Sequence, residues 1–276
     1  MESIASWPLV PGNWLWVPLV YASYLAVVAF TGREFARARP PLLIAAAAAA
    51  GLFVLGEGAP LTPGWSVVVP SIVLVTGYWL SGLLFVRPDV GLERWLIEMD
   101  DRVLRRTGIL DAYERSPRAL HEFIELSYLL VYPAVPAGAA TLLVSGRTAD
   151  LDRFWTVVLL AEFACYGMLP WLQTRPPRVL EPAPPAARHT LLRRLNLQIA
   201  GRASIQVNTV PSGHAAGAFA AALAIMSAQI EAGIVFLAVA VSISVATVLG
   251  RYHYAVDTAL GVAVAFGAWF LAGGAG

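Results

Sequence analysis

Three short polar stretches stand out in a chain that is otherwise strongly apolar. They are "QTRPPR" at 173–178, "PSGH" at 211–214 and "GRYHYAVD" at 250–257. Arginines are forked, permanently charged donors that match phosphate oxygens, and histidines transfer protons or attack phosphorus near neutral pH. Two histidines, one aspartate and several arginines would therefore form a phosphoryl-transfer site without a metal.

The third stretch contains a histidine and an aspartate four residues apart, His253 and Asp257. If the last helix begins near His253, both side chains lie on one helix face, and Asp257 can hold one imidazole nitrogen. The other nitrogen then points outward as a nucleophile. His214, in the second stretch, remains as the acid that protonates a leaving oxygen.

The second stretch precedes a run of small apolar residues, so Ser212 and Gly213 stand at a predicted helix start. Such a start offers a hydroxyl and free backbone N–H groups at a positive helix end, which favours an anion. We expect both residues to bind phosphate oxygens together with three arginines of the other stretches: Arg175, Arg178 and Arg251.

Each of these features has a simpler interpretation when it is taken alone. Ser212 could serve only as a helix cap, and Arg251 could be an interfacial anchor. The other two arginines could be positive-inside residues, and the histidines and the aspartate could be structural or could hold a metal. Neighbouring arginines would repel a cation, and three stretches on one side of the membrane favour the catalytic interpretation.

The elements that position these stretches are membrane helices by composition. The chain of 276 residues is 58% hydrophobic and 13% charged, whereas soluble domains average about 25% charged residues. A transmembrane helix needs roughly 17–25 mostly apolar residues. We expect an all-α, polytopic helical membrane protein with about six to eight transmembrane helices. The eight candidate segments are 13–30, 41–56, 66–86, 126–144, 154–172, 215–230, 232–249 and 256–275.

The segment 87–125 is more polar and predicts a different kind of helix. Apolar residues recur there at helical spacing with acids and arginines between them, which indicates an amphipathic helix along the membrane surface. These apolar residues are Leu92, Trp95, Leu96, Met99 and Val103. We divide the chain into 1–125, with the N-terminal helices and the interfacial segment, and 126–276, the catalytic helical core. Both parts belong to one integrated membrane domain.

The distribution of basic residues predicts the orientation. All 19 are arginines, and if every candidate segment crosses the membrane, 17 of them share a side with the three polar stretches. Only Arg147 and Arg153 fall on the other side. Because cytoplasmic loops carry an excess of basic residues, we expect a multi-pass protein whose site faces the cytoplasm.

"PSGH" followed by "RYHYAVD" resembles the type 2 phosphatidic acid phosphatase (PAP2) superfamily, over about residues 160–260. The family pattern is Lys-x6-Arg-Pro, Pro-Ser-Gly-His and Ser-Arg-x5-His-x3-Asp. Here Met168 stands at the position of the lysine, Gly250 replaces the serine, and one residue separates Arg251 from His253. "QTRPPR" and "HYAVD" look more like the inositol-phosphorylceramide-synthase-like branch, which transfers a phospho-headgroup between lipids.

The resemblance implies a PAP2-like helical core and a role for each motif residue. His253 would form a phosphohistidine, Asp257 would orient it, and His214 would protonate the leaving alcohol and later activate the acceptor. Phosphate oxygens would be held by Arg175, Arg251, Ser212 and the Gly213 amide. Arg178 would substitute for part of the phosphate contact that the missing lysine leaves open. The resemblance implies no metal and no cofactor.

We therefore expect a membrane-embedded lipid phosphatase that hydrolyses the phosphate ester or pyrophosphate of a lipid in the bilayer. We expect no nucleic-acid partner, and the sequence does not set the oligomeric state. A headgroup phosphotransferase is the alternative, because transfer and hydrolysis share their first half-reaction. A transporter or channel with a His/Asp proton relay is the second alternative; a relay would tolerate the loss of Arg175 and Arg251 better than a phosphate site would.

Overall fold

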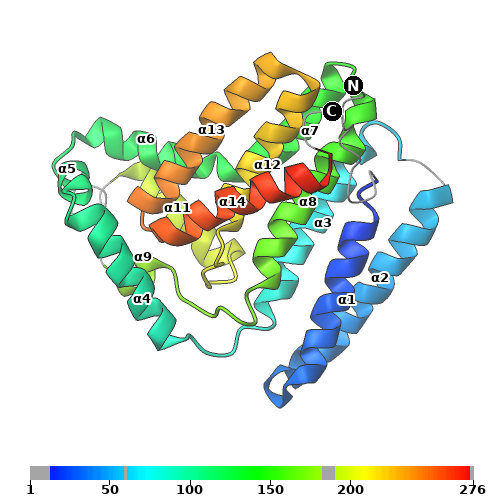
Figure 1. Cartoon of the computed structure of the whole chain (residues 1–276), viewed down its shortest axis with the longest axis horizontal. Coiled ribbons are helices and arrows are strands. Elements are labelled where there is room, and N and C mark those ends of the chain that lie inside the picture. The colour runs from blue at the N-terminus through cyan, green and yellow to red at the C-terminus, as the bar shows by residue number, and fades with distance from the viewer. Residues whose placement is uncertain (1–12, 59–60, 182–189, 274–276) are drawn as a thin grey trace, which may run out of the picture.

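The computed structural model describes residues 13–58, 61–181 and 190–273. This part of the chain contains thirteen α-helices, two short 3₁₀ segments, one π-helical segment and no β-strand. The predicted all-α fold is confirmed. Figure 1 shows a central bundle with an antiparallel pair of helices on one side and shorter helices on the other.

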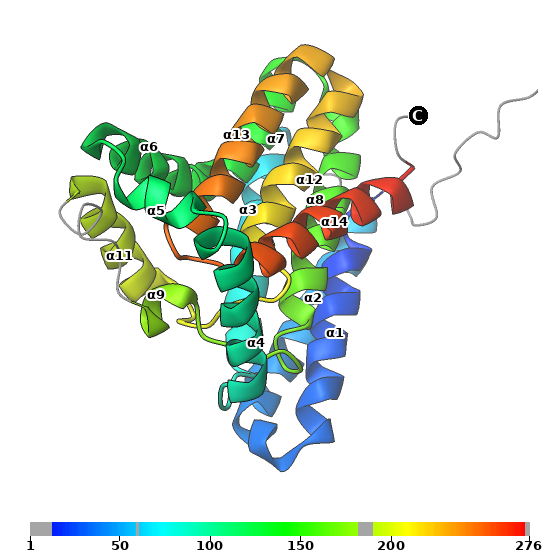
Figure 2. The ribbon, with the colours of Figure 1, turned by 60° about the vertical axis from the view of Figure 1, so that its left-hand side comes forward.

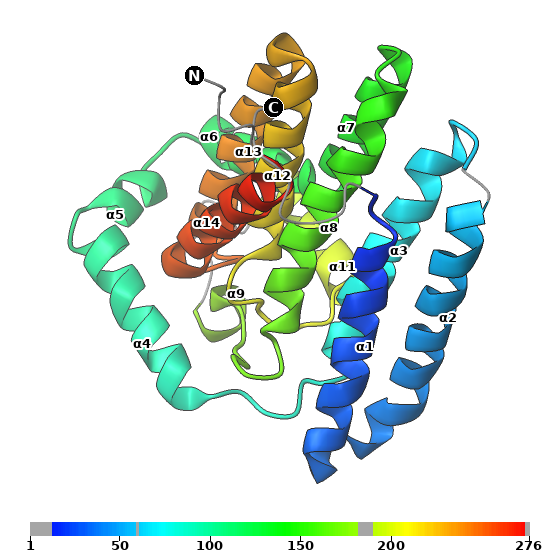
Figure 3. The same cartoon turned by 45° about the vertical axis from the view of Figure 1, so that its right-hand side comes forward.

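The N-terminal helices form the antiparallel pair and its neighbour. Helix α1 spans Trp16–Thr31, the 3₁₀ segment η1 spans Arg33–Ala38, and α2 spans Arg39–Gly58. Helix α3, Trp65–Gly82, follows and packs against α7 (Val131–Val144) and α8 (Leu151–Gly167). Helices α1, α2 and α3 lie side by side at one edge of the molecule (Figure 3). They are apolar around most of their circumference, and many large apolar side chains on them are exposed. Such a surface suits lipid better than water.

Helix α12, Gly213–Ala228, lies at the centre of the bundle. Its first thirteen residues are mostly alanine and glycine, and nearly all of them are buried. Small side chains let neighbouring helices approach closely. The neighbours of α12 are α7, α8 (Leu151–Gly167), α13 (Ile230–Leu249) and α14 (Ala255–Leu271).

The segment predicted as one helix over 126–144 is bent. Helix α6 spans Arg118–Leu129, and α7 spans Val131–Val144, with an angle of 55° between them. Pro133 lacks the backbone N–H that would bond to the Leu129 carbonyl, so the regular hydrogen-bond ladder cannot continue across this point. The bend lets α6 run beside the site while α7 enters the bundle. The 3₁₀ segment η3, Thr148–Asp150, then leads into α8.

The segment predicted to be amphipathic forms a helix that lies across one flank of the bundle (Figure 2). Helix α4 spans Val90–Asp100, begins with the Asp89 side chain as its cap, and continues as a π-helical turn over Asp101–Arg105. Helix α5, Ile109–Glu114, follows. The second polar stretch holds α9, Pro177–Leu180, and α11, Leu191–Ala203.

Three described helical segments are long and apolar enough to cross a membrane: Arg33–Glu57, Trp65–Gly82 and Ile230–Leu249. The bent α6–α7 pair makes a fourth if it counts as one span. Shorter apolar helices are Trp16–Thr31, Gly213–Ala228 and Ala255–Leu271. Each of the eight predicted segments overlaps a helix, and the segment 126–144 covers two. The number of six to eight transmembrane helices stays a prediction.

Candidate active site

The three polar stretches converge at one end of the central bundle, and backbone hydrogen bonds tie them together. The Arg178 N–H of the first stretch donates to the Arg251 carbonyl of the third at 2.8 Å. The Ser212 N–H of the second donates to the Asp257 carbonyl, also at 2.8 Å. Stretches that are separated in sequence therefore form one structural unit.

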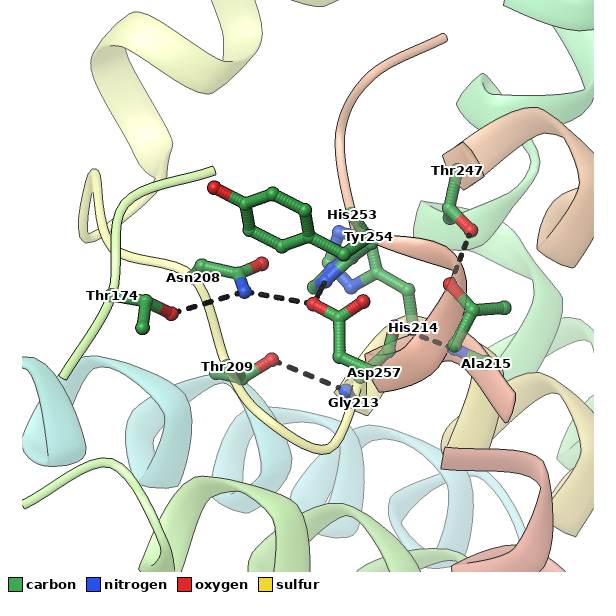
Figure 4. Close-up of polar contacts among 12 residues, drawn as sticks. Thr174, Asn208, Thr209, Gly213, His214, Ala215, Thr247, His253, Tyr254 and Asp257 are labelled. Carbon is green, nitrogen blue, oxygen red and sulfur yellow. Dashed lines mark hydrogen bonds and ion pairs between the residues drawn. The ribbon is translucent and has the colours of Figure 1, made fainter. Parts of the chain in front are cut away.

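The two histidines face each other within this unit (Figure 4). The ring centroids of His214 and His253 are 5.2 Å apart, with the ring planes at 73°. His253 Nδ1 lies 3.2 Å from Asp257 Oδ2, in the i,i+4 relation that the sequence predicts. Within the described part of the chain, His253 Nε2 has no hydrogen-bond partner. This geometry suits an imidazole that is held at one nitrogen and is reactive at the other.

A buried amide fixes the aspartate. Asn208 Nδ2 donates to Asp257 Oδ2 at 2.7 Å and to Thr174 Oγ1 at 3.2 Å, so a residue just before the second stretch joins the first and third stretches (Figure 4). The Asn208 N–H also donates to the Thr174 carbonyl at 2.8 Å. Sequence reasoning did not select Asn208 or Thr174. The available signal was their position, since each is a polar residue beside a motif in an apolar chain.

The environment keeps His253 neutral. The residue lies in the loop between α13 and α14, and burial lowers its pKa to about 3, with a further contribution from the positive charge of Arg178. A neutral imidazole carries the lone pair that nucleophilic attack requires.

The second histidine contacts a tyrosine, which the sequence analysis did not predict as a site residue. The Tyr128 hydroxyl of α6 lies 3.3 Å from His214 Nε2. The Tyr128 ring stacks on Tyr252 with centroids 3.5 Å apart, and the Tyr252 hydroxyl donates to Glu125 Oε2 at 2.7 Å. These contacts fix the position of Tyr128 beside His214. Its signal in the sequence is weak, because tyrosines are common near membrane interfaces.

The "PSGH" stretch begins α12 as predicted, and its polar groups already have partners. Ser212 Oγ accepts from the Ala215 N–H at 3.4 Å, so the hydroxyl caps the helix. The Gly213 N–H donates to Thr209 Oγ1 at 3.2 Å (Figure 4). Phosphate binding by Ser212 and Gly213 stays a prediction, and it requires these contacts to be exchanged for substrate.

Two of the three predicted phosphate-binding arginines are paired with carboxylates. Arg175 Nε and Nη2 contact both oxygens of Glu93 at 2.9 and 2.8 Å, and these hydrogen bonds lower the pKa of Glu93. Arg251 Nη1 contacts Asp100 at 2.6 Å, and its Nη2 contacts Glu181 at 2.8 Å. Glu93 and Asp100 both come from α4, seven residues apart and hence on one helix face. Sequence reasoning did not anticipate either acid.

The third arginine is differently placed. The Arg178 guanidinium has no ion pair or hydrogen bond within the described residues and lies over the Tyr252 ring, 5.7 Å from its centroid. It lines the same pocket as His214 and His253. Met168, at the position of the family lysine, is 40% exposed and does not line this pocket. Among the described residues, Arg178 is therefore an arginine beside the histidines without a carboxylate partner.

This pocket has a volume of about 230 Å³ and mostly apolar walls. Helices α3 and α7 provide one wall, and the histidines and Arg178 lie at the polar end. Val75, Trp79 and Tyr132 line the pocket and are also exposed, so it reaches the surface between α3 and α7. Among the described residues, no group of three or more His, Cys, Asp or Glu side chains is arranged to hold a metal ion.

Fold and site together define an all-helical protein with a histidine–aspartate pair, a second histidine and a free arginine at the end of an apolar pocket. A sequence model of the PAP2 superfamily matches residues 94–271, more than half of the chain. The protein therefore belongs to the PAP2 superfamily, as its motifs predict. No curated protein and no solved structure matches significantly. The inositol-phosphorylceramide-synthase-like branch stays a prediction.

Proposed function

We propose that this protein is a membrane-embedded lipid phosphatase that works through a covalent phosphohistidine on His253. One observation carries the proposal: His253, His214 and Arg178 line a single pocket with apolar walls. The walls suit an acyl or prenyl chain, and the polar end suits its phosphate. Several apolar helices and membership of the PAP2 superfamily agree with this reaction class and with a membrane setting.

In the first half-reaction, His253 Nε2 attacks the phosphorus of the lipid phosphate. A P–N bond forms, and the P–O bond to the lipid breaks. The leaving oxygen takes a proton from His214, which has itself taken that proton from the phosphate monoanion of the substrate. It departs as the lipid alcohol, or as a lipid monophosphate if the substrate is a pyrophosphate. Asp257 holds His253 Nδ1 and stabilises the positive charge that develops on the ring.

In the second half-reaction, a water molecule attacks the phosphorus of the phosphohistidine. His214, now neutral, takes the water proton, the P–N bond breaks, and inorganic phosphate leaves. A lipid hydroxyl in place of water would give headgroup transfer by the same steps.

Because Arg175 and Arg251 are paired with carboxylates, we infer that Arg178 makes the direct contact with phosphate. A guanidinium offers several donors in a fixed fork that matches phosphate oxygens. Arg175 and Arg251, held by Glu93 and Asp100, would act by positioning the loops that carry His253 and Arg178. The resemblance to the family instead implies that Arg175 and Arg251 hold phosphate oxygens and that Arg178 substitutes for only part of the missing contact.

The test uses the purified full chain with a panel of lipid phosphates, lipid pyrophosphates and phosphoinositol lipids. We expect wild type to release phosphate from at least one of them and His253→Ala to release none. His214→Ala should be slower by about 10²–10⁴, the usual contribution of an acid–base group. Radiolabelled phosphate should be trapped on the protein by an alkaline quench, because phosphohistidine survives alkali, and the label should be absent from His253→Ala.

Each variant is compared with wild type by thermal unfolding, so that a loss of activity is not confused with a loss of folding. Label that moves to a second lipid without release of inorganic phosphate would identify the transferase instead. If no lipid loses phosphate, or if both histidine variants match wild type, the enzyme proposal is wrong.

A further inference from the structure

The two histidines of the site are held by different kinds of group. His253 Nδ1 lies 3.2 Å from the Asp257 carboxylate, whereas His214 Nε2 lies 3.3 Å from the Tyr128 hydroxyl. A carboxylate is negative when ionised, so it stabilises a positive imidazole. A hydroxyl oxygen is neutral and accepts an N–H without the same stabilisation. The first partner suits a ring that becomes positive when it is phosphorylated, and the second suits a ring that must give its proton away.

The contact with Tyr128 also distinguishes the two nitrogens of His214. Within the described part of the chain, His214 Nδ1 has no hydrogen-bond partner, and the residue lines the pocket. A neutral imidazole carries its proton on one nitrogen, and the hydrogen bonds of the ring decide which one. If the Nε2 N–H donates to the tyrosine oxygen, Nδ1 keeps its lone pair and is the nitrogen left for a ligand.

Buried contacts hold Tyr128 in this position. It lies in the last turn of α6, just before the bend, and its ring stacks on Tyr252 with the centroids 3.5 Å apart and the planes at 6°. The Tyr252 hydroxyl donates to Glu125, which also accepts from Arg193 at 3.0 Å and from Asn196 at 2.8 Å. All five side chains are buried. The tyrosine hydroxyl is therefore in place before a substrate binds, which lowers the cost of orienting the histidine.

We propose that Tyr128 is a positioning residue for His214: its hydroxyl oxygen accepts from the Nε2 N–H, so that Nδ1 alone exchanges protons with the reactants. This inference rests on the proposed function and deepens it. Nδ1 takes a proton from the phosphate monoanion and gives it to the leaving oxygen as the P–O bond breaks. It then takes a proton from the attacking water and returns it to the departing phosphate. The Nε2 proton stays in place throughout, and Tyr128 is unchanged at the end.

The test compares two leaving groups that differ in their need for an acid. One substrate is a long-chain alkyl phosphate, whose oxygen must be protonated as it leaves. The other is a 2-nitrophenyl phosphate with the same chain on its ring, whose nitrophenolate leaves without a proton. Tyr128→Phe removes the hydroxyl and keeps the ring stack. It should lower kcat/KM about tenfold for the alkyl phosphate, a part of the 10²–10⁴ that an acid–base group contributes, and less than about twofold for the nitrophenyl phosphate.

Two further variants distinguish positioning from a structural role. Tyr24→Phe removes a hydroxyl that donates to the Gly167 carbonyl at 2.8 Å and does not line the pocket, so the ratio of the two substrates should stay at the wild-type value. Tyr128→Phe in a His214→Ala background should cause no further loss with the alkyl phosphate, because the tyrosine acts only through this histidine. Equal losses for both substrates, or additive losses in the double variant, would overturn the proposal.

A measurement without turnover separates this inference from the phosphatase proposal. Nitrogen NMR on protein with ¹⁵N-labelled histidines reports which ring nitrogen carries the proton, and His214→Ala identifies the signals of that residue. At pH 8 an imidazole with an ordinary pKa of about 6.5 is neutral. We expect the His214 proton on Nε2 in wild type and a mixture of both tautomers in Tyr128→Phe, even if no lipid phosphate is cleaved. A wild-type proton on Nδ1, or signals that Tyr128→Phe leaves unchanged, would refute the positioning role.

Discussion

At the scale of single residues, the charge of Arg178 and the burial of the loop after α13 together control the protonation of His253. Both lower its pKa, so the imidazole is neutral throughout the range in which most proteins are folded. In the proposed reaction the same arginine would also bind the phosphate. One residue would then serve two purposes: it would attract the substrate and keep the nucleophile unprotonated.

The pH dependence of kcat/KM tests this arrangement. Because the pKa of His253 is about 3, wild type should show no acid inflection from the nucleophile near the ordinary histidine value of about 6.5. Arg178→Leu removes a positive charge, so the pKa of His253 should rise and the acid limb should move to higher pH. The measurement is kcat/KM between pH 4 and 8. A limb that stays in place in the variant would contradict the assignment.

The same shift has a consequence for stability, with a definite sign. Below about pH 6.5 the unfolded chain binds a proton at His253, and the folded protein does not. The free energy of unfolding therefore falls as pH decreases from about 6.5 toward 3. Glu93 acts in the same direction, because its lowered pKa stabilises the folded state above its ordinary pKa and this contribution is lost on acidification.

At the scale of elements, α4 holds in place the loops that carry the first and third motifs. Its two inward acids bind the arginines of the first and third motifs, and the Asp100 carboxylate also accepts from the Ala255 N–H at the start of α14 at 2.8 Å. Arg251 adopts a positive φ of 60°, a backbone conformation that is strained for a residue with a side chain. Its two ion pairs help to maintain this conformation beside His253.

Replacement of Asp100 measures how much its ion pair with Arg251 contributes to stability and activity. Asp100→Asn leaves the buried Arg251 guanidinium with Glu181 as its remaining carboxylate, and breaking a buried pair costs about 3 kcal/mol. We expect a matching loss in the free energy of unfolding in detergent, together with lower activity. Glu98→Gln, on the exposed face of the same helix, breaks only a 3.9 Å surface pair with Arg102. It should change stability by no more than about 0.5 kcal/mol, and equal effects of the two variants would refute the positioning role.

At the scale of the whole molecule, the proposed reaction needs lateral access for lipid and a defined side of the membrane. The pocket reaches the surface between α3 and α7, and both α3 and the α6–α7 pair are candidate membrane spans. A lipid could therefore enter sideways without leaving the bilayer. The predicted boundary at 125/126 remains a prediction, and the acids of α4 contact both motif arginines across it.

Orientation is testable by cysteine labelling, because the natural cysteine, Cys165, is buried. Glu98→Cys introduces an exposed thiol on the arginine-rich side, and Thr148→Cys introduces one at the opposite end, between α7 and α8. If the site faces the cytoplasm, a membrane-impermeant maleimide added to intact cells should label position 148 and not position 98. The reverse pattern would place the site on the opposite side of the membrane.

The sequence by itself determined the features that depend on neighbouring residues. Apolar runs predicted the helices, Ser212 marked the start of α12, and the i,i+4 spacing of His253 and Asp257 predicted their contact. These follow from local periodicity and capping, which a sequence displays directly. Proline positions also carried the signal for the bend after Leu129, although the prediction of one helix over 126–144 did not use it.

Only the tertiary structure decided how the charges are distributed over the site. The three arginines are alike in sequence, and Arg178 is the free one because α4 brings Glu93 to Arg175 and Asp100 to Arg251 from about eighty and one hundred and fifty residues away. Asn208 likewise contacts Thr174 and Asp257, which are distant from it in sequence. Pairing of buried charges depends on which elements pack together, and that packing is a property of the whole fold rather than of any local pattern.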